Sequence, residues 1–349
     1  MTAFTEKERL LAVLNKQPVD RPPVICPGGM MNAAIVSVMK NSGYVLPAAH
    51  ADAALMAALA YNVHKLTGFE NFGLPFCMTV EAEVLGSEID LGTLECEPKI
   101  SREIYASCSQ VEYREINAML TTGRIPVVCQ AASLLSTKYP DIPVIGSLTG
   151  PVSTAASLVD PIPFLKDLRK DPAAAHKVFS YVTDLLIAFA HKLIANGAAV
   201  IAIGDPTATG EILGPKLFAE YAVTYINKLI AAIQQKGVPV IVHICGNLNS
   251  VKQLIPAIKA NAISTDALVN LKQLKDEFPQ LTTMGNISTY LLEFGPAEKA
   301  ALQTSNLVAQ GIDIIAPACG LSTSSPLDNI RAMTATVKGA YQKERMETL

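Results

Sequence analysis

Residues 239–247 read PVIVHICGN, a run rich in β-branched residues that ends on a histidine and, two positions later, a cysteine. Continuously apolar runs of this kind are typical of strands that are buried on both faces, as in parallel sheets. Seven similar runs occur at 23–26, 72–76, 143–148, 199–204, 262–265, 282–285 and 313–318. Most are separated by helix-length segments whose apolar residues recur at spacings of three and four.

Eight strands that are mostly followed by helices predict a (β/α)8 TIM barrel. A doubly wound sheet is the alternative, but no GxGxxG follows an early strand. We expect one domain over residues 1–349, with a short N-terminal helical segment at 5–16. The stretch 77–142 is too long for one crossover helix, so it predicts an insertion after the second strand that caps the barrel mouth. Within it, 78–100 alternates like a hairpin and 125–139 has a helical pattern.

Composition narrows the classes of partner. The net charge is −3, only 17% of the residues are charged, and long basic runs are absent, so we expect neither nucleic acid nor a membrane surface as a partner. The start, MTAFTEKERL, is too charged for a signal peptide, and every 18-residue apolar stretch contains charges or helix breakers. We therefore expect a cytoplasmic protein, whose seven cysteines are mostly buried thiols.

Three nitrogen and sulfur donors are predicted to meet at the barrel mouth, where the C-terminal ends of the strands carry the active site. His243 and Cys245 share one face of their strand, and Cys319 leaves the last strand at the same end. Two thiolates and an imidazole suit zinc and leave a fourth position open, as in catalytic sites. Asp266, at the end of the neighbouring strand, is the candidate for that position until a substrate displaces it. The alternative is two buried cysteines and a hydrogen-bonded histidine.

The segments HICGN (243–247) and PACGLS (317–322) resemble the His-x-Cys…Cys zinc signature of the methylcobamide:coenzyme M methyltransferases, which belong to the uroporphyrinogen decarboxylase superfamily. The resemblance covers most of the chain, because further blocks follow in the family's order: VDRPPV (19–24), LPFCMTVEAEVLG (74–86), GSLTGP (146–151), GDPTATGEILGP (204–215) and GNIS (285–288). Decarboxylases of the superfamily carry an early arginine-rich motif that handles porphyrin carboxylates. The corresponding loop here, CPGGMMN (26–32), has no arginine.

The resemblance implies a zinc-dependent methyltransferase that moves a methyl group from a methylated corrinoid, a methylcobamide, to a thiol such as coenzyme M. His243, Cys245 and Cys319 would be the zinc ligands and the thiol the incoming ligand. The expected partners are a methylated corrinoid protein and a small thiol substrate. Three alternatives stay open: a porphyrin decarboxylase, a methylcorrinoid:tetrahydrofolate methyltransferase, and a barrel that binds corrinoid or metal without catalysis.

Five further residues near strand ends are candidates for the site. Asp205 is expected to orient His243 through its second ring nitrogen or to contact substrate or corrin, although an aspartate before proline also forms turns. Asn247 and Asn286 follow strands and are expected to line the pocket as catalytic residues. Gly28 and Gly29 would let a flat corrin or a lid approach the backbone closely, or would simply form a turn.

Overall fold

Six strands of the computed structural model, which describes residues 4–339, form one parallel sheet whose strand order follows the chain. In sheet order they are β1 (Phe72–Leu74), β4 (Val144–Thr149), β5 (Val200–Gly204), β6 (Val240–Ile244), β7 (Ala262–Thr265) and β8 (Thr283–Met284). Each coincides with one of the predicted apolar runs. The central strands are buried along nearly their whole length, which explains why their sequences are apolar without alternation.

The first and last predicted strands, 23–26 and 313–318, contribute single parallel bridges instead of ladders. Val24 pairs with Ile315, and the residue before Ile315 pairs with Met284 of β8. In the last segment, Pro317 lacks the N–H that a longer ladder needs. These bridges extend the sheet from β8 back to the start of the chain.

The ring closes between the first segment and β1. The backbone N–H of Glu70 donates to the carbonyl oxygen of Val24 at 2.8 Å. The side-chain amide of Asn71 bonds both the N–H and the carbonyl of Cys26 at 2.9 Å, and so takes the place of a neighbouring strand. The architecture is the (β/α)8 barrel that the sequence predicts.

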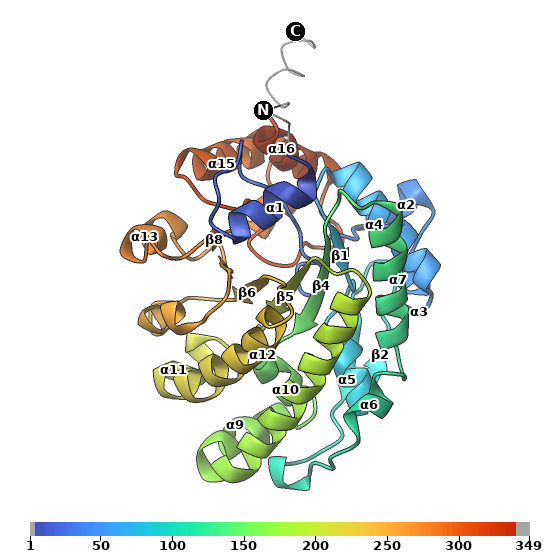
Figure 1. Ribbon diagram of the computed structural model, residues 1–349, viewed down its shortest axis with the longest axis vertical. Coiled ribbons are helices and arrows are strands. Elements are labelled where there is room, and N and C mark those ends of the chain that lie inside the picture. The colour runs from blue at the N-terminus through green and yellow to red at the C-terminus, as the bar shows by residue number, and fades with distance from the viewer. Residues whose placement is uncertain (1–3, 340–349) are drawn as a thin grey trace.

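Helices surround this barrel (Figure 1). Those of the barrel wall and its N-terminal end are α1 (Glu6–Leu14), α4 (Ala53–Thr67), α7 (Ile125–Lys138), α10 (Pro172–Ala195), α12 (Thr224–Gln234), α13 (Leu271–Glu277), α15 (Ala297–Ala309) and α16 (Leu327–Val337). Shorter helical segments are α2 (Val36–Ser42), α3 (Ala48–Ala51), α5 (Val80–Leu85), α6 (Ile116–Met119), α8 (Pro151–Ala156), α9 (Pro161–Lys170), α11 (Gly210–Leu217), α14 (Thr289–Phe294), the 3-10 helices at 108–110 and 252–257, and the π-helix at 218–223.

The longest helix, α10, begins with Pro172 at its first position, and Asp171 caps it by accepting the Ala174 N–H. Among residues 4–339 it alone is long and apolar enough to cross a membrane, by length and composition. However, 56% of its most apolar window is buried inside the protein. Val182 and Phe189, for example, are fully buried in the core, so the apolar composition is explained by packing in the barrel wall.

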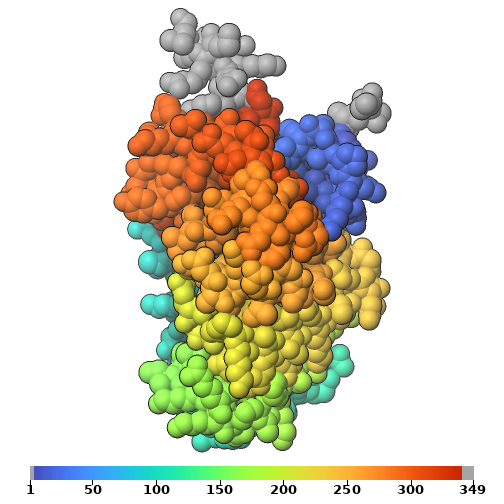
Figure 2. All heavy atoms as spheres, turned by 90° about the vertical axis from the view of Figure 1, so that its left-hand side faces the viewer, coloured from blue at the N-terminus to red at the C-terminus, as the bar shows by residue number. Residues whose placement is uncertain are grey.

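The predicted N-terminal helical segment is confirmed as α1. Thr5 and Glu8 form a reciprocal capping box that fixes its start. Lys16, just after the helix, donates to the carbonyl oxygen of Gln280 at 2.9 Å, so the start of the chain lies beside the segment between α13 and β8. Figure 2 shows this neighbourhood as blue spheres against orange ones.

The segment after β1 differs in part from the prediction. The short strands β2 (Glu88–Asp90) and β3 (Lys99–Arg102) are antiparallel, as the hairpin pattern indicates, but residues 80–85 form helix α5. Gly86, in the left-handed conformation, ends that helix. The turn between β2 and β3 reaches the barrel mouth: the Thr323 hydroxyl donates to the Glu95 carbonyl oxygen at 2.7 Å.

Candidate functional site

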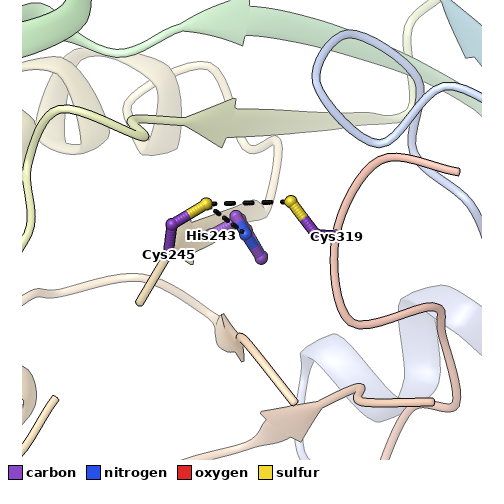
Figure 3. Close-up of side chains that lie close together, drawn as sticks. All are labelled: His243, Cys245 and Cys319. Carbon is purple, nitrogen blue, oxygen red and sulfur yellow. Dashed lines mark hydrogen bonds between the residues drawn. The ribbon is translucent and has the colours of Figure 1, made fainter. Parts of the chain in front are cut away.

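Three donor side chains converge at the mouth of the barrel (Figure 3). Nε2 of His243, at the end of β6, lies 3.3 Å from Sγ of Cys245, which lies 3.8 Å from Sγ of Cys319. One donor atom from each residue falls within 4.8 Å of the other two. His243 is buried, whereas both cysteines are partly exposed, so the group faces the open end of the barrel.

The spacing of these donors fits one tetrahedral zinc ion. With zinc–sulfur bonds of about 2.3 Å and zinc–nitrogen bonds of about 2.0 Å, tetrahedral geometry separates two sulfurs by about 3.8 Å and a sulfur and a nitrogen by about 3.6 Å. The separations of 3.8 Å and 3.3 Å are close to these values. Two thiolates and a neutral imidazole are also a donor set that zinc prefers.

A shared proton links the two cysteines. The hydrogen bond from Cys245, supported by His243, lowers the pKa of Cys319 well below that of an ordinary thiol. The same hydrogen bond, together with burial, raises the pKa of Cys245. Because two neighbouring thiolates repel each other, a cation bound to both sulfurs would stabilise their charged form.

Ser264 fixes the orientation of the imidazole. Its hydroxyl lies 2.9 Å from Nδ1 of His243, and this fully buried serine pairs with His243 in the register of β6 and β7. The hydrogen bond occupies Nδ1 and leaves Nε2 facing the sulfurs. The expectation that Asp205 orients His243 is therefore wrong.

Asp205 instead caps a helix. Its carboxylate is completely buried and accepts hydrogen bonds from the backbone N–H groups of Val152 and Ser153 at 2.9 and 2.8 Å, at the start of α8. Burial raises its pKa to about 6, against the opposing effect of these hydrogen bonds. At Gly150 a Cβ would lie only 2.4 Å from the Asp205 side chain, so the carboxylate is enclosed by the α8 turn. It positions this turn, and its contact with substrate or corrin stays a prediction.

Asp266 does not join the three donors. Its Oδ1 accepts the backbone N–H of Leu268 at 2.9 Å, which makes it a turn-forming residue after β7. Among residues 4–339 the donor group with the spacing to hold a metal ion contains His243, Cys245 and Cys319, without this carboxylate. The structure gives no support to Asp266 as the fourth ligand.

The two asparagines stabilise loops at the mouth. Nδ2 of the buried Asn286 donates to the carbonyl oxygens of Asp266 and Val269, at 2.7 and 2.8 Å, and so holds the loop that follows β7. Oδ1 of the exposed Asn247 accepts the backbone N–H of Asn249 at 2.8 Å in a turn. Both side chains therefore hold loops at the mouth, and a catalytic role for either stays a prediction.

Gly28 and Gly29 permit a close approach, but to the barrel itself. Both have positive φ angles, 93° and 59°. A Cβ at Gly28 would lie 2.6 Å from the backbone of Gly73 in β1, and a Cβ at Gly29 would lie 2.8 Å from Cβ of Ser147 in β4. The close contacts of both glycines within the protein are therefore with the inner wall of the barrel, and an approach by a corrin or a lid stays a prediction.

Other residues that shape the site are not evident from the sequence. Ser264 lies on a strand whose register relative to β6 cannot be read from the chain. Met30 lies in a loop, CPGGMMN, whose shape cannot be read from the chain either. A groove of about 450 Å³ lies beside Cys319. It is lined by Glu95, Glu97, Thr289, Tyr290, Glu293 and residues 320–323.

Comparison with known proteins agrees with this fold. The family model described as Uroporphyrinogen decarboxylase (URO-D) matches residues 5–340. The methylcobamide:CoM methyltransferase MtbA of Methanosarcina acetivorans is 33% identical over 340 residues, covering 97% of this chain and 99% of that protein. A methyltransferase from Methanosarcina mazei superposes with a TM-score of 0.90 at 32% identity, over 97% of this chain and 99% of that one. A uroporphyrinogen decarboxylase of Myxococcus xanthus is 26% identical over 165 residues, covering 45% of this chain and 46% of that enzyme.

The barrel gathers one histidine and two cysteines at its mouth, and the family model matches nearly the whole chain. The chain belongs to the uroporphyrinogen decarboxylase family and, within it, to the methylcobamide:coenzyme M methyltransferase branch. The resemblance of the chain to this family is thereby confirmed.

Proposed function

We propose that this protein is a zinc-dependent methyltransferase that moves a methyl group from a methylated corrinoid to a thiol. The observation that carries the proposal is the convergence of His243, Cys245 and Cys319 within 4.8 Å at the open end of the barrel. Relatives that match nearly the whole chain are named methylcobamide:CoM methyltransferases, which supports this reaction class.

Zinc at this site would lower the pKa of an incoming thiol so that the acceptor reacts as a thiolate. His243, held through Nδ1 by Ser264, supplies a neutral nitrogen donor, and the two cysteines supply negative charge that keeps the acceptor sulfur electron-rich. The sulfur attacks the methyl carbon as the carbon–cobalt bond breaks. The bonding pair stays on cobalt, which changes from Co(III) to Co(I), and the thiol proton leaves to solvent.

The methyl donor is proposed to arrive on a separate corrinoid protein. Large apolar side chains are exposed on segments that follow the C-terminal ends of strands: Ile212 after β5, Leu268 after β7, and Tyr290 and Phe294 after β8. Leu268 and Tyr290 are each 73% exposed. An apolar rim around the mouth fits a protein partner that must bring its cofactor close to the donors. The 77–142 segment is a second candidate for this docking, because Glu95 already contacts the mouth.

The charge of the groove beside Cys319 predicts which acceptor thiols fit, because the part of the acceptor beyond its sulfur would lie there. Glu95, Glu97 and Glu293 line it, and none of them forms an ion pair with another residue in the described part of the chain. Coenzyme M, the acceptor named for the relatives, carries a sulfonate. Because like charges repel, an uncharged or cationic tail fits this groove better than a sulfonate.

Porphyrin decarboxylation fits the structure less well. The loop that follows Val24 contains no arginine, and the Myxococcus xanthus decarboxylase is 26% identical over 165 residues, against 33% over 340 residues for MtbA of Methanosarcina acetivorans. A tetra-anionic porphyrin also finds no compensating charge in a groove lined by Glu95, Glu97 and Glu293.

The test is loss of the methylcobalamin absorbance after thiol is added to zinc-loaded protein, with mass-spectrometric detection of the methyl thioether. We expect activity in the wild type, loss of activity in Cys245→Ala and Cys319→Ala, and normal activity in the control Cys96→Ala, since Cys96 is exposed in the β2–β3 turn. Inactive wild-type protein would contradict the proposal. Methyl transfer to tetrahydrofolate but to no thiol would support the folate alternative.

A further inference from the structure

The thioether of Met30 lies beside the three donors. Its Sδ is 4.0 Å from Sγ of Cys245, although the two residues are 215 positions apart in the chain. Met30 also lines, with His243, a small internal space under the mouth. A fourth soft donor is therefore next to the metal-binding group.

Two glycines leave the space that Met30 occupies. At Gly204, which ends β5, a Cβ would lie 3.1 Å from Cβ and 3.4 Å from Sδ of Met30. At Gly320, directly after Cys319, a Cβ would lie 2.5 Å from the carbonyl oxygen of Met30. Larger residues at these two strand ends would displace the methionine. The position of Met30 beside Cys245 therefore depends on its own loop, on the glycine that ends β5 and on the glycine that follows Cys319.

We propose that Sδ of Met30 is the fourth donor to the metal and that the acceptor thiol displaces it. This inference rests on the proposed function, because it requires a metal at His243, Cys245 and Cys319. The 4.0 Å separation from Cys245 is close to the roughly 3.8 Å edge between two sulfur ligands of a tetrahedral zinc ion. Thioether sulfur belongs with thiolate among the soft ligands that zinc accepts.

The chemistry of a thioether suits a displaceable ligand. It is neutral, so the site with two thiolates carries no net charge before the acceptor arrives. A carboxylate in the same place would be an anion that the incoming thiolate must replace. Met30 also excludes water from the fourth position. The side chain thus keeps the metal four-coordinate until a stronger sulfur donor binds.

Selenomethionine labelling tests this directly. In labelled, zinc-loaded protein without acceptor, zinc-edge X-ray absorption detects a selenium neighbour only if a methionine is a ligand. We expect one selenium in the first shell of the wild type, lost in Met30→Leu and lost from the wild type when thiol is added. The control Met31→Leu should keep it, because Sδ of Met31 faces Ser264 at 3.9 Å.

A second readout is thiol affinity. Met30→Leu retains a side chain of similar size but offers no donor, so the thiol no longer competes with a protein ligand. Its dissociation constant, followed by the spectrum of the cobalt-substituted protein, should fall about threefold to tenfold, a range that corresponds to about 1 kcal/mol.

The outcomes separate the two proposals. Wild-type protein that binds zinc without a selenium neighbour overturns the role of Met30 and leaves the metal site intact. Wild-type protein that binds no zinc overturns the proposed function and the Met30 ligand with it. A selenium neighbour that persists after thiol binding would show that Met30 is not displaced, and would overturn the exchange.

Discussion

Removing the Ser264 hydroxyl tests how strongly the barrel fixes its histidine. In Ser264→Ala the hydrogen bond of 2.9 Å to Nδ1 of His243 is lost, and the ring nitrogen is left in a site that excludes water. Loss of such a supporting hydrogen bond typically lowers metal affinity 10-fold to 100-fold, or about 1.4 to 2.8 kcal/mol. We expect a decrease in zinc affinity within this range, with little change in overall fold.

The assay is competition for zinc with a chromophoric chelator, at fixed pH, for wild type and variants. Thr265→Val is the matched control: Thr265 is the next residue of β7, and its buried hydroxyl has no hydrogen-bond partner in the described structure. That variant should bind zinc as the wild type does. Equal affinities of Ser264→Ala and wild type would refute the reasoning, since they would show that the ring is held without the serine.

Three further predictions concern charge and packing. His50 is fully buried, and burial and Arg124 lower its pKa to about 4. The folded state therefore loses up to about 3 kcal/mol of stability as the pH falls from about 6.5 to 4. Denaturant unfolding across this range should show that His50→Leu removes this part of the pH dependence, and an unchanged dependence of the unfolding free energy on pH would contradict the prediction. Glu97→Gln should lower the KM for coenzyme M about threefold, because it removes one repulsive charge from the groove. The KM for 2-mercaptoethanol, which carries no sulfonate, should not change. Equal effects on both thiols would exclude the electrostatic explanation. Gly150→Ala should destabilise the fold by about 1 to 3 kcal/mol, because its Cβ would lie 2.4 Å from buried Asp205; an unfolding free energy within about 0.5 kcal/mol of the wild type would argue against that clash.

Much of the barrel is predictable because buried parallel strands have a clear signature. PVIVHI at 239–244 is apolar on both faces, as are the other five runs that became ladders. The runs at 23–26 and 313–318 are also rich in apolar residues, yet they form isolated bridges, and in the second of them Pro317 interrupts the pairing. Residues 80–85 alternate between apolar and polar side chains as a strand does, yet they form a helix that buries most of its side chains at the barrel mouth.

The metal-binding group was predictable for a related reason. His243 and Cys245 share a strand face, and both strand ends that carry the donors open at the same side of a barrel. The partners of these donors were not predictable, because they depend on register and loop shape. Ser264 faces His243 only through the pairing of β6 with β7, and Met30 reaches Cys245 only because Gly204 and Gly320 leave room.

Asp205 shows the limit of reasoning from strand ends. It follows β5 as a catalytic residue would, but its carboxylate turns back to the first N–H groups of α8. A polar residue after a strand can hold the next helix as well as a substrate, and only the three-dimensional positions of its neighbours distinguish the two.

The most direct test of the central claim is the zinc content of the purified protein, measured by inductively coupled plasma mass spectrometry for the wild type, His243→Ala, Cys245→Ala and Cys319→Ala. The arrangement of these donors predicts about one zinc per wild-type chain and loss of that zinc in each variant. Wild-type protein without zinc, or a Cys319→Ala variant that keeps it with unchanged affinity, would contradict the assignment of these residues as a metal site.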